Sequence, residues 1–93
     1  MKFEVQYHDF VRRHDYSALD FEMRARIKRA IESKLMTQPA RFGKPLRGSL
    51  KGSWKLRVGD YRIIFSIKKQ IVYIYGIVHR STVYKAVLAR LMN

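Results

Sequence analysis

Three cationic side chains close together in the chain are the first candidates for chemistry: Lys55, Arg57 and Arg62, in the stretch GSWKLRVGDYRIIF (52–65). Apolar and cationic residues alternate here on both sides of Gly59-Asp60, a pair typical of a two-residue hairpin turn. Such a turn fixes the register, so that Arg57 lies opposite Arg62 and Lys55 shares their side of the sheet. Like charges directly opposite each other destabilise a hairpin, by up to about 1 kcal/mol.

An anion between the two arginines would turn this repulsion into attraction. The planar guanidinium donates paired hydrogen bonds that match a phosphate group, and a local inconsistency of this kind tends to mark a functional site. The same residues also fit a solvated basic face with no special role, and this alternative stays open. If KKQ (68–70) is a three-residue connection, Arg62 faces Gly76, and Arg80 lies on the same side. A two-residue connection would reverse the parity of the next strand.

The elements that must hold these residues are three strands with a period of two, expected over 54–58, 61–67 and 71–78. Short turns join them into an antiparallel meander. A further strand is expected over 2–7. The fold class is therefore α+β, in the order β-α-α-β-β-β, with the helices packed on one face of the sheet.

The helical part is expected over 10–35, in two pieces, of which the second has apolar residues at helical spacing. Asp20 or Ser17 can cap its start. Both prolines and Gly43 fall in 37–45, which predicts a loop. An additional C-terminal helix is expected over 81–92.

Composition restricts the class of protein and the partner. The 93 residues fit a single domain, 1–93, and 20 Lys and Arg against seven Asp and Glu give a formal charge of +13. Nucleic acid is the first candidate partner, before an acidic protein or an anionic membrane surface. The absence of cysteine, of a signal peptide and of an apolar spanning segment fits a soluble cytoplasmic protein. Three scattered histidines show no metal-ligand spacing, so no metal or cofactor is expected.

Two segments taken together resemble one known family. KPLRGSLKGSWKLRVGDYRIIF and, after it, VYIYGIVHRSTVYK resemble the RelE/ParE superfamily of bacterial type II toxin–antitoxin proteins, on the RelE side. The resemblance implies a RelE-like fold and ribosome-dependent cleavage of mRNA at the A-site codon. In that reaction a ribose 2′-OH attacks the adjacent phosphate and leaves a 2′,3′-cyclic phosphate. It also implies an antitoxin partner with an acidic toxin-binding segment, and an operator DNA for the toxin–antitoxin complex.

The resemblance also carries over candidate site residues. The catalytic candidates are Lys55, Arg57, Arg62, His79, Arg80 and Tyr84. Lys44, Arg47 and Lys51 are candidates for diffuse contacts to RNA. The arginines suit charge stabilisation at the phosphate, because they stay protonated. Lys55 is a candidate general base, because neighbouring cations favour loss of its proton.

Several of these residues have simpler explanations. His79, which titrates near neutrality, could instead pack at the end of a strand, and Arg80 could be a surface cation. Tyr84 could stack on a base or anchor the C-terminal segment to the core. Trp54 is expected in the core by alternation.

Two other functions also remain open. One is a ParE-like toxin that inhibits gyrase without cutting RNA, and the other is an RNA-binding module without chemistry.

Overall fold

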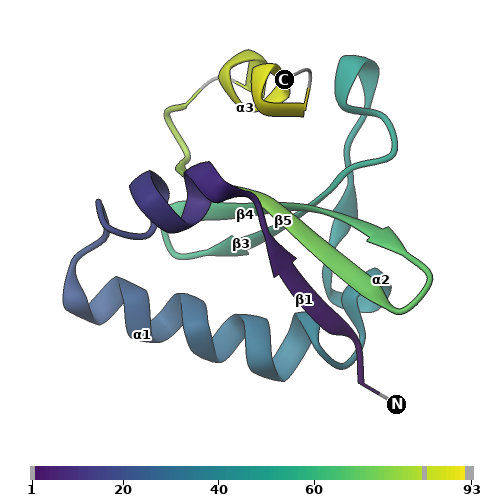
Figure 1. Ribbon diagram of the computed structural model, residues 1–93, viewed down its shortest axis with the longest axis horizontal. Helices are drawn as coiled ribbons and strands as arrows, with labels where there is room; N and C mark the ends of the chain where they lie inside the picture. The colour runs from purple at the N-terminus through teal and green to yellow at the C-terminus, as the bar shows by residue number, and fades with distance from the viewer. Residues whose placement is uncertain (1, 83, 92–93) are drawn as a thin grey trace.

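A five-stranded mixed sheet forms the centre of the molecule (Figure 1). The computed structural model describes residues 2–82 and 84–91. The strand order is β1-β5-β4-β3-β2; β1 runs parallel to β5, and the other neighbours are antiparallel. The strands are β1 (Glu4–Tyr7), β2 (Lys44–Pro45), β3 (Trp54–Val58), β4 (Tyr61–Lys68) and β5 (Ile71–His79).

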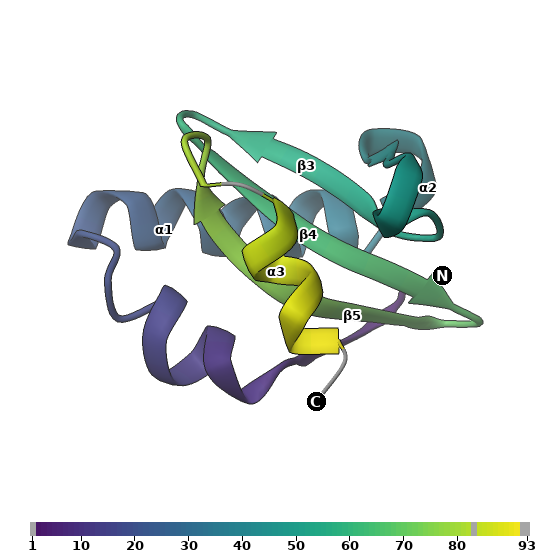
Figure 2. The same ribbon diagram turned by 90° about the horizontal axis from the view of Figure 1, so that it is seen from above.

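Helical segments lie on both faces of this sheet (Figure 2). They are η1 (Val11–Asp15), α1 (Phe21–Ala30), its π-helical continuation η2 (Ile31–Leu35), α2 (Pro39–Phe42), the 3-10 turn η3 (Gly48–Leu50) and α3 (Tyr84–Leu91). Asp20 caps α1 by accepting the Met23 N–H at 2.7 Å, so of the two candidate caps Asp20 is confirmed. No helix among the described residues has the length and apolar character needed to cross a membrane.

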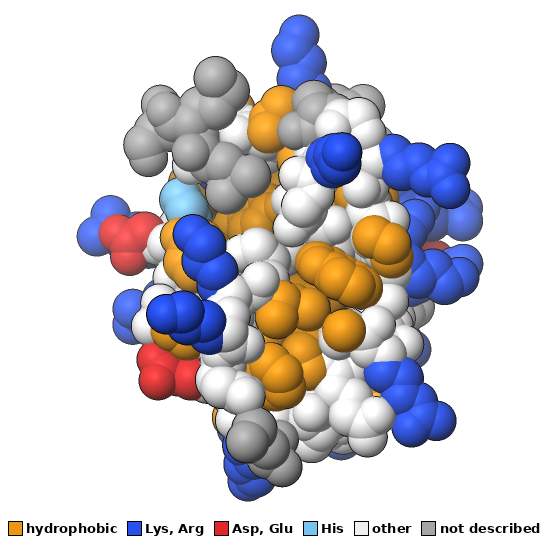
Figure 3. Space-filling model, turned by 90° about the vertical axis from the view of Figure 1, so that its right-hand side faces the viewer, with side chains coloured by type: hydrophobic (Ala, Val, Ile, Leu, Met, Phe, Trp, Pro, Cys, Tyr) orange, Lys and Arg blue, Asp and Glu red, His pale blue; other side chains and the backbone are white. Residues whose placement is uncertain are grey.

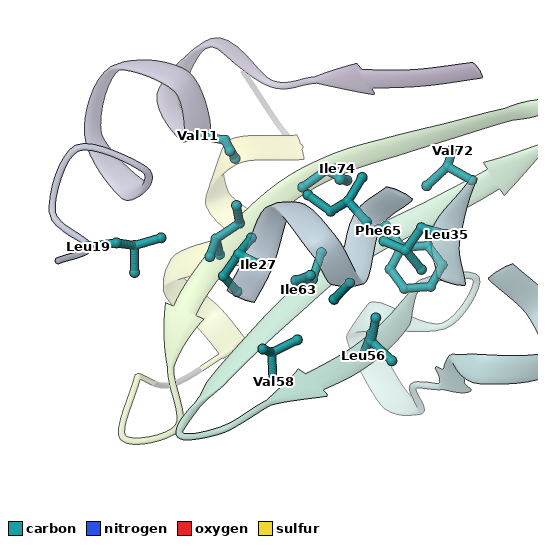
Figure 4. Close-up of a cluster of buried hydrophobic side chains, with 13 residues drawn as sticks. Val11, Leu19, Ile27, Leu35, Leu56, Val58, Ile63, Phe65, Val72 and Ile74 are labelled. Atoms are coloured by element: carbon teal, nitrogen blue, oxygen red, sulfur yellow. The ribbon is translucent and has the colours of Figure 1, made fainter. Parts of the chain in front are cut away.

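The main core lies between α1 and one face of the sheet, here called the α1 face (Figure 4). The fully buried side chains there include Ile27 from α1, Leu35 from η2, and Ile63 and Phe65 from β4. Burial of each such side chain contributes about 1.5–3 kcal/mol. Trp54 packs against this cluster, as expected from alternation. The period-two pattern of the hairpin therefore determines which of its side chains lie on the α1 face.

The predicted hairpin is confirmed residue by residue. Val58 pairs with Tyr61, and Arg57 pairs with Arg62. Gly59 has φ +60°, a value that suits the first central position of a type II′ turn and that side chains rarely adopt. The predicted α+β class is also confirmed, and the element order agrees broadly with the predicted one, with short elements added between the helical part and β3.

Residues 37–45, expected as a loop, form two short elements instead. Pro39 starts α2, and Lys44–Pro45 form the edge strand β2 against β3. Gly43 joins them where the chain passes close to the core, because a Cβ there would come within 2.7 Å of Phe65 Cζ. Proline is tolerated on an edge strand, so the prolines here did not exclude a strand.

Of the two connections left open for residues 68–70, the two-residue one forms. The turn after β4 has two residues, so that Lys68 pairs with Ile71. Lys69 adopts φ 56°, a conformation more often taken by glycine, so no glycine indicated which of the two turn lengths would form. A bulge follows, because Ile64 pairs with Gly76 while Phe65 pairs with Ile74. Arg62 consequently faces Val78 rather than Gly76.

The second face of the sheet, here called the α3 face, is covered in part by α3. The expectation that the helices pack on one face was therefore incomplete. A smaller cluster of Ile64, Tyr75, Val78 and Val87 lies beneath α3. A Cβ on Gly76 would lie 3.1 Å from Val87 Cγ1. Gly76 thus leaves room for the helix, and the predicted role of admitting a ligand is not needed to explain it.

Candidate functional site: a cationic strip beside α3

Four cations from three neighbouring strands share the α3 face. Arg57 pairs with Arg62 across β3 and β4, and Lys44 pairs with Lys55 across β2 and β3. Directly opposed residues have Cβ atoms about 4.5–5.5 Å apart. We call these four residues the cationic strip. Within the part of the chain that the structure describes, none of them has an ion-pair partner.

Arg62 has contacts on two sides. It is half-buried, and its Nη1 lies 3.4 Å from the Arg80 carbonyl oxygen. Its guanidinium carbon lies 5.8 Å from the centre of the Tyr84 ring, within the range of a cation–π contact. Arg57 is exposed and donates from Nε to the Gly59 carbonyl at 3.1 Å. Both guanidinium groups keep free donors for an anion.

The chain after β5 returns to the β3–β4 hairpin. The Arg80 N–H donates to the Asp60 carbonyl at 2.8 Å. Arg80 is exposed, and its backbone lies beside Arg62 through the contact described above. The structure therefore brings Arg80 next to the strip, as expected from the sequence. Its side chain is free to turn toward a ligand.

Tyr84 begins α3 and lies partly over the smaller cluster. Its ring packs against the Ile64 and Val87 group, while its hydroxyl is buried without a hydrogen-bond partner. This placement matches the anchoring role that was left open. The ring also lies beside Arg62, so anchoring of the C-terminal segment and a role at the site do not exclude each other.

His79 lies apart from the strip. It pairs with Tyr61, on the α1 face, and the two rings meet edge to face at 5.4 Å. Its Nδ1 lies 2.8 Å from Ser81 Oγ and accepts the Ser81 N–H at 3.2 Å. This environment fits the end-of-strand alternative. The structure does not bring His79 together with Arg57 and Arg62.

The three residues expected to contact RNA fall into two groups. Lys44 belongs to the strip. Its place beside Lys55 was not predicted from the sequence, because residues 37–45 were expected to form a loop. Arg47 and Lys51 are exposed on either side of η3, which contacts α3. They therefore lie near α3, outside the strip.

Positive charge extends over other parts of the surface as well. On the side that carries α2 and the β4–β5 turn, Lys and Arg surround an apolar patch (Figure 3). Arg26 reaches the tip of the hairpin, since its Nη1 would lie 3.1 Å from a Cβ on Gly59. Among the described residues, no three His, Cys, Asp or Glu side chains gather as a metal site would need.

Comparison with known proteins gives the family. The model for the ParE toxin of type II toxin–antitoxin systems (parDE) matches residues 8–84. Two toxins of Mycobacterium tuberculosis match over 53 residues, 55% of this chain: Toxin RelE at 42% identity and Toxin RelG at 38%. The chain spans 55% and 61% of the length of these relatives.

The fold has a solved counterpart. A chain of the toxin–antitoxin complex RelBE2 from Mycobacterium tuberculosis superposes with a TM-score of 0.79 at 30% identity. The match covers 86% of the present chain and 100% of the other. With the family match over most of the chain, this protein belongs to the ParE toxin family of type II toxin–antitoxin systems, within the RelE/ParE superfamily.

Proposed function

We propose that this toxin is an mRNA endoribonuclease that cuts the codon in the ribosomal A site and so stops translation in the cytoplasm. The observation that supports this most is the cationic strip: two like-charge pairs on neighbouring strands, without ion-pair partners among the described residues. A structural role for these charges would be served better by a carboxylate partner. A phosphodiester supplies the missing negative charge.

The strip suits the charge that develops during cleavage. As the 2′-oxygen attacks, negative charge builds on the phosphate oxygens, and Arg57 and Arg62 can donate to them. Arg62 is held in advance by the Arg80 carbonyl and the Tyr84 ring, so little reorganisation is needed when the substrate binds. Donors fixed in this way are worth on the order of 10²–10³ in rate each.

Lys55 is the proposed general base. In its neutral form it takes the 2′-OH proton, the new P–O2′ bond forms, and the P–O5′ bond breaks. The leaving 5′-oxygen takes a proton from solvent water, so the products are a 2′,3′-cyclic phosphate and a 5′-OH. The side chain of Lys55 is half-buried, pairs across the sheet with Lys44 and lies on the same face as Arg57 and Arg62. His79 has no part in this proposal, because it lies on the α1 face.

A second function has a specific observation in its favour. The family model that matches residues 8–84 is that of the ParE toxin. A ParE-like toxin that inhibits gyrase would not need the strip for chemistry. In either case we propose an antitoxin as partner, because the structural counterpart was solved as a toxin–antitoxin complex. An acidic segment would complement a chain of formal charge +13.

The test is a reconstituted translation reaction with purified toxin, read by primer extension on the message. We expect new 5′-OH ends within codons on translating ribosomes, and none on naked mRNA. Arg62→Ala should lower the cleavage rate on the order of 10²–10³ while the fold and antitoxin binding persist. Arg29→Ala, which removes a charge from α1 on the other face, is the matched control and should cut normally. Intact message together with inhibited gyrase supercoiling would support the second function instead.

A further inference from the structure

A buried ion pair joins segments from opposite ends of the chain. The Asp15 side chain is 4% exposed and that of Arg90 is 15% exposed. The guanidinium donates twice to the carboxylate, at 2.6 Å to Oδ2 and 3.0 Å to Oδ1. Its carbon also lies 4.4 Å from the centre of the Phe10 ring. The two residues are 75 positions apart, so the contact ties η1 directly to α3.

The same pair completes the edge of β5. The neighbouring strand β1 ends at Tyr7, so that backbone groups farther along β5 have no strand beside them on the β1 side. There the Ile77 N–H donates to Asp15 Oδ2 at 2.9 Å, and Arg90 Nη1 donates to the Tyr75 carbonyl at 3.1 Å. The two side chains thus take the place of the missing strand. They act at the bulge itself, on both sides of Gly76.

Helix α3 connects this ion pair to the cationic strip. Arg90 lies in the last turn of the helix and Tyr84 at its first residue, about 9 Å apart along the axis. Between them Val87 is fully buried close to Gly76. One end of α3 is therefore fixed by the ion pair, and the other end places the Tyr84 ring beside Arg62.

A buried pair of this kind is weak evidence for a role in stability alone, because apolar residues of similar size often serve as well. Its directional hydrogen bonds also define the position of α3 relative to β5. We propose that Asp15 and Arg90 are positioning residues of the cleavage site: they set the rotation and tilt of α3, and through Tyr84 they order Arg62. The activity part of this inference rests on the proposed function, whereas the structural part does not.

The first experiment compares Asp15→Asn with Asp9→Asn. Asp9 lies in the same segment, 3.9 Å from exposed Arg13, so its variant has the same charge change without the buried contact. We expect faster hydrogen exchange in α3 and at the Ile77 amide for Asp15→Asn only. In reconstituted translation, kcat should fall on the order of 10- to 100-fold with KM nearly unchanged, as a small misplacement of reactive groups would cause. Arg90→Lys, which keeps the charge but not the paired bonds, should lie in between.

A second comparison separates positioning from simple destabilisation. If the pair acts through Tyr84, then Asp15→Asn should add little further loss in a Tyr84→Ala background. Asp15→Asn with Arg90→Met, which keeps an acceptor for Ile77 and an apolar stem, serves as the folded variant if the single change unfolds the chain. Unchanged exchange in α3, or losses that simply multiply with Tyr84→Ala, would overturn the proposal. A wild-type protein that cuts no message would overturn the proposed function, and the exchange arm would still decide whether the pair orders α3.

Discussion

The repulsion between Arg57 and Arg62 can be measured directly. We expect a double-mutant cycle with Arg57→Gln and Arg62→Gln to give a destabilising coupling energy between the two side chains. Two unit charges about 6 Å apart repel by about 0.7 kcal/mol in bulk water, and measured cross-strand pairs fall between about 0.2 and 1 kcal/mol. The cycle is needed because each arginine also makes a contact of its own, to Gly59 and to the Arg80 carbonyl. Those single losses cancel in the coupling term.

Ionic strength tests the physical origin of that energy. The screening length is about 30 Å at 0.01 M salt and about 3 Å at 1 M, so the coupling should fall from roughly 0.6 kcal/mol to about 0.1 kcal/mol. The assay is unfolding in urea, because guanidinium chloride would itself supply the salt. A cycle between Arg57 and Arg29, on opposite sides of the sheet, is the control and should be additive at both salt concentrations. A coupling that is zero at low salt, or that does not change with salt, would refute the claim that these charges oppose folding.

Three other substitutions test the fold around the site. Gly76→Ala should lower the free energy of unfolding by about 1–3 kcal/mol, since its Cβ would press on Val87; urea unfolding measures this. Lys69→Gly should raise it by roughly 0.5 kcal/mol, because relief of a left-handed residue outweighs the added chain entropy. Burial raises the pKa of Tyr75, against a smaller lowering by its hydrogen bond to Ser53. The folded state therefore keeps this proton longer than the unfolded chain, so stability should fall as pH rises above about 10, and Tyr75→Phe should flatten that fall.

Much of the strip could be predicted because local chemistry determines it. Gly59-Asp60 fixed the turn, and alternation then placed Arg57 opposite Arg62 and the apolar residues on the α1 face. The Asp20 cap followed from its position before an apolar periodic segment. In each case the residues that decide the structure lie within a few positions of the feature they determine.

The remaining features depend on contacts that no local pattern encodes. Lys44 joined the strip through a two-residue edge strand that contains a proline. The β4–β5 turn used a lysine where a glycine would have been expected. The Asp15–Arg90 pair spans 75 positions. These features arise from tertiary packing, which overrides local preference.

The bulge in β5 determines the face of the sheet on which His79 lies. A two-residue turn alone would have reversed the parity of the strand and placed His79 on the same face as Arg62. The extra residue, Tyr75, has no partner in the ladder with β4 and restores the parity, so that Val78 faces Arg62 and His79 faces Tyr61. The ion pair holds the Tyr75 carbonyl and the Ile77 amide, the groups on either side of Gly76. The contact that orders α3 therefore also stabilises the irregularity that keeps His79 away from the strip, which leaves Lys55 as the proton acceptor that the proposed cleavage requires.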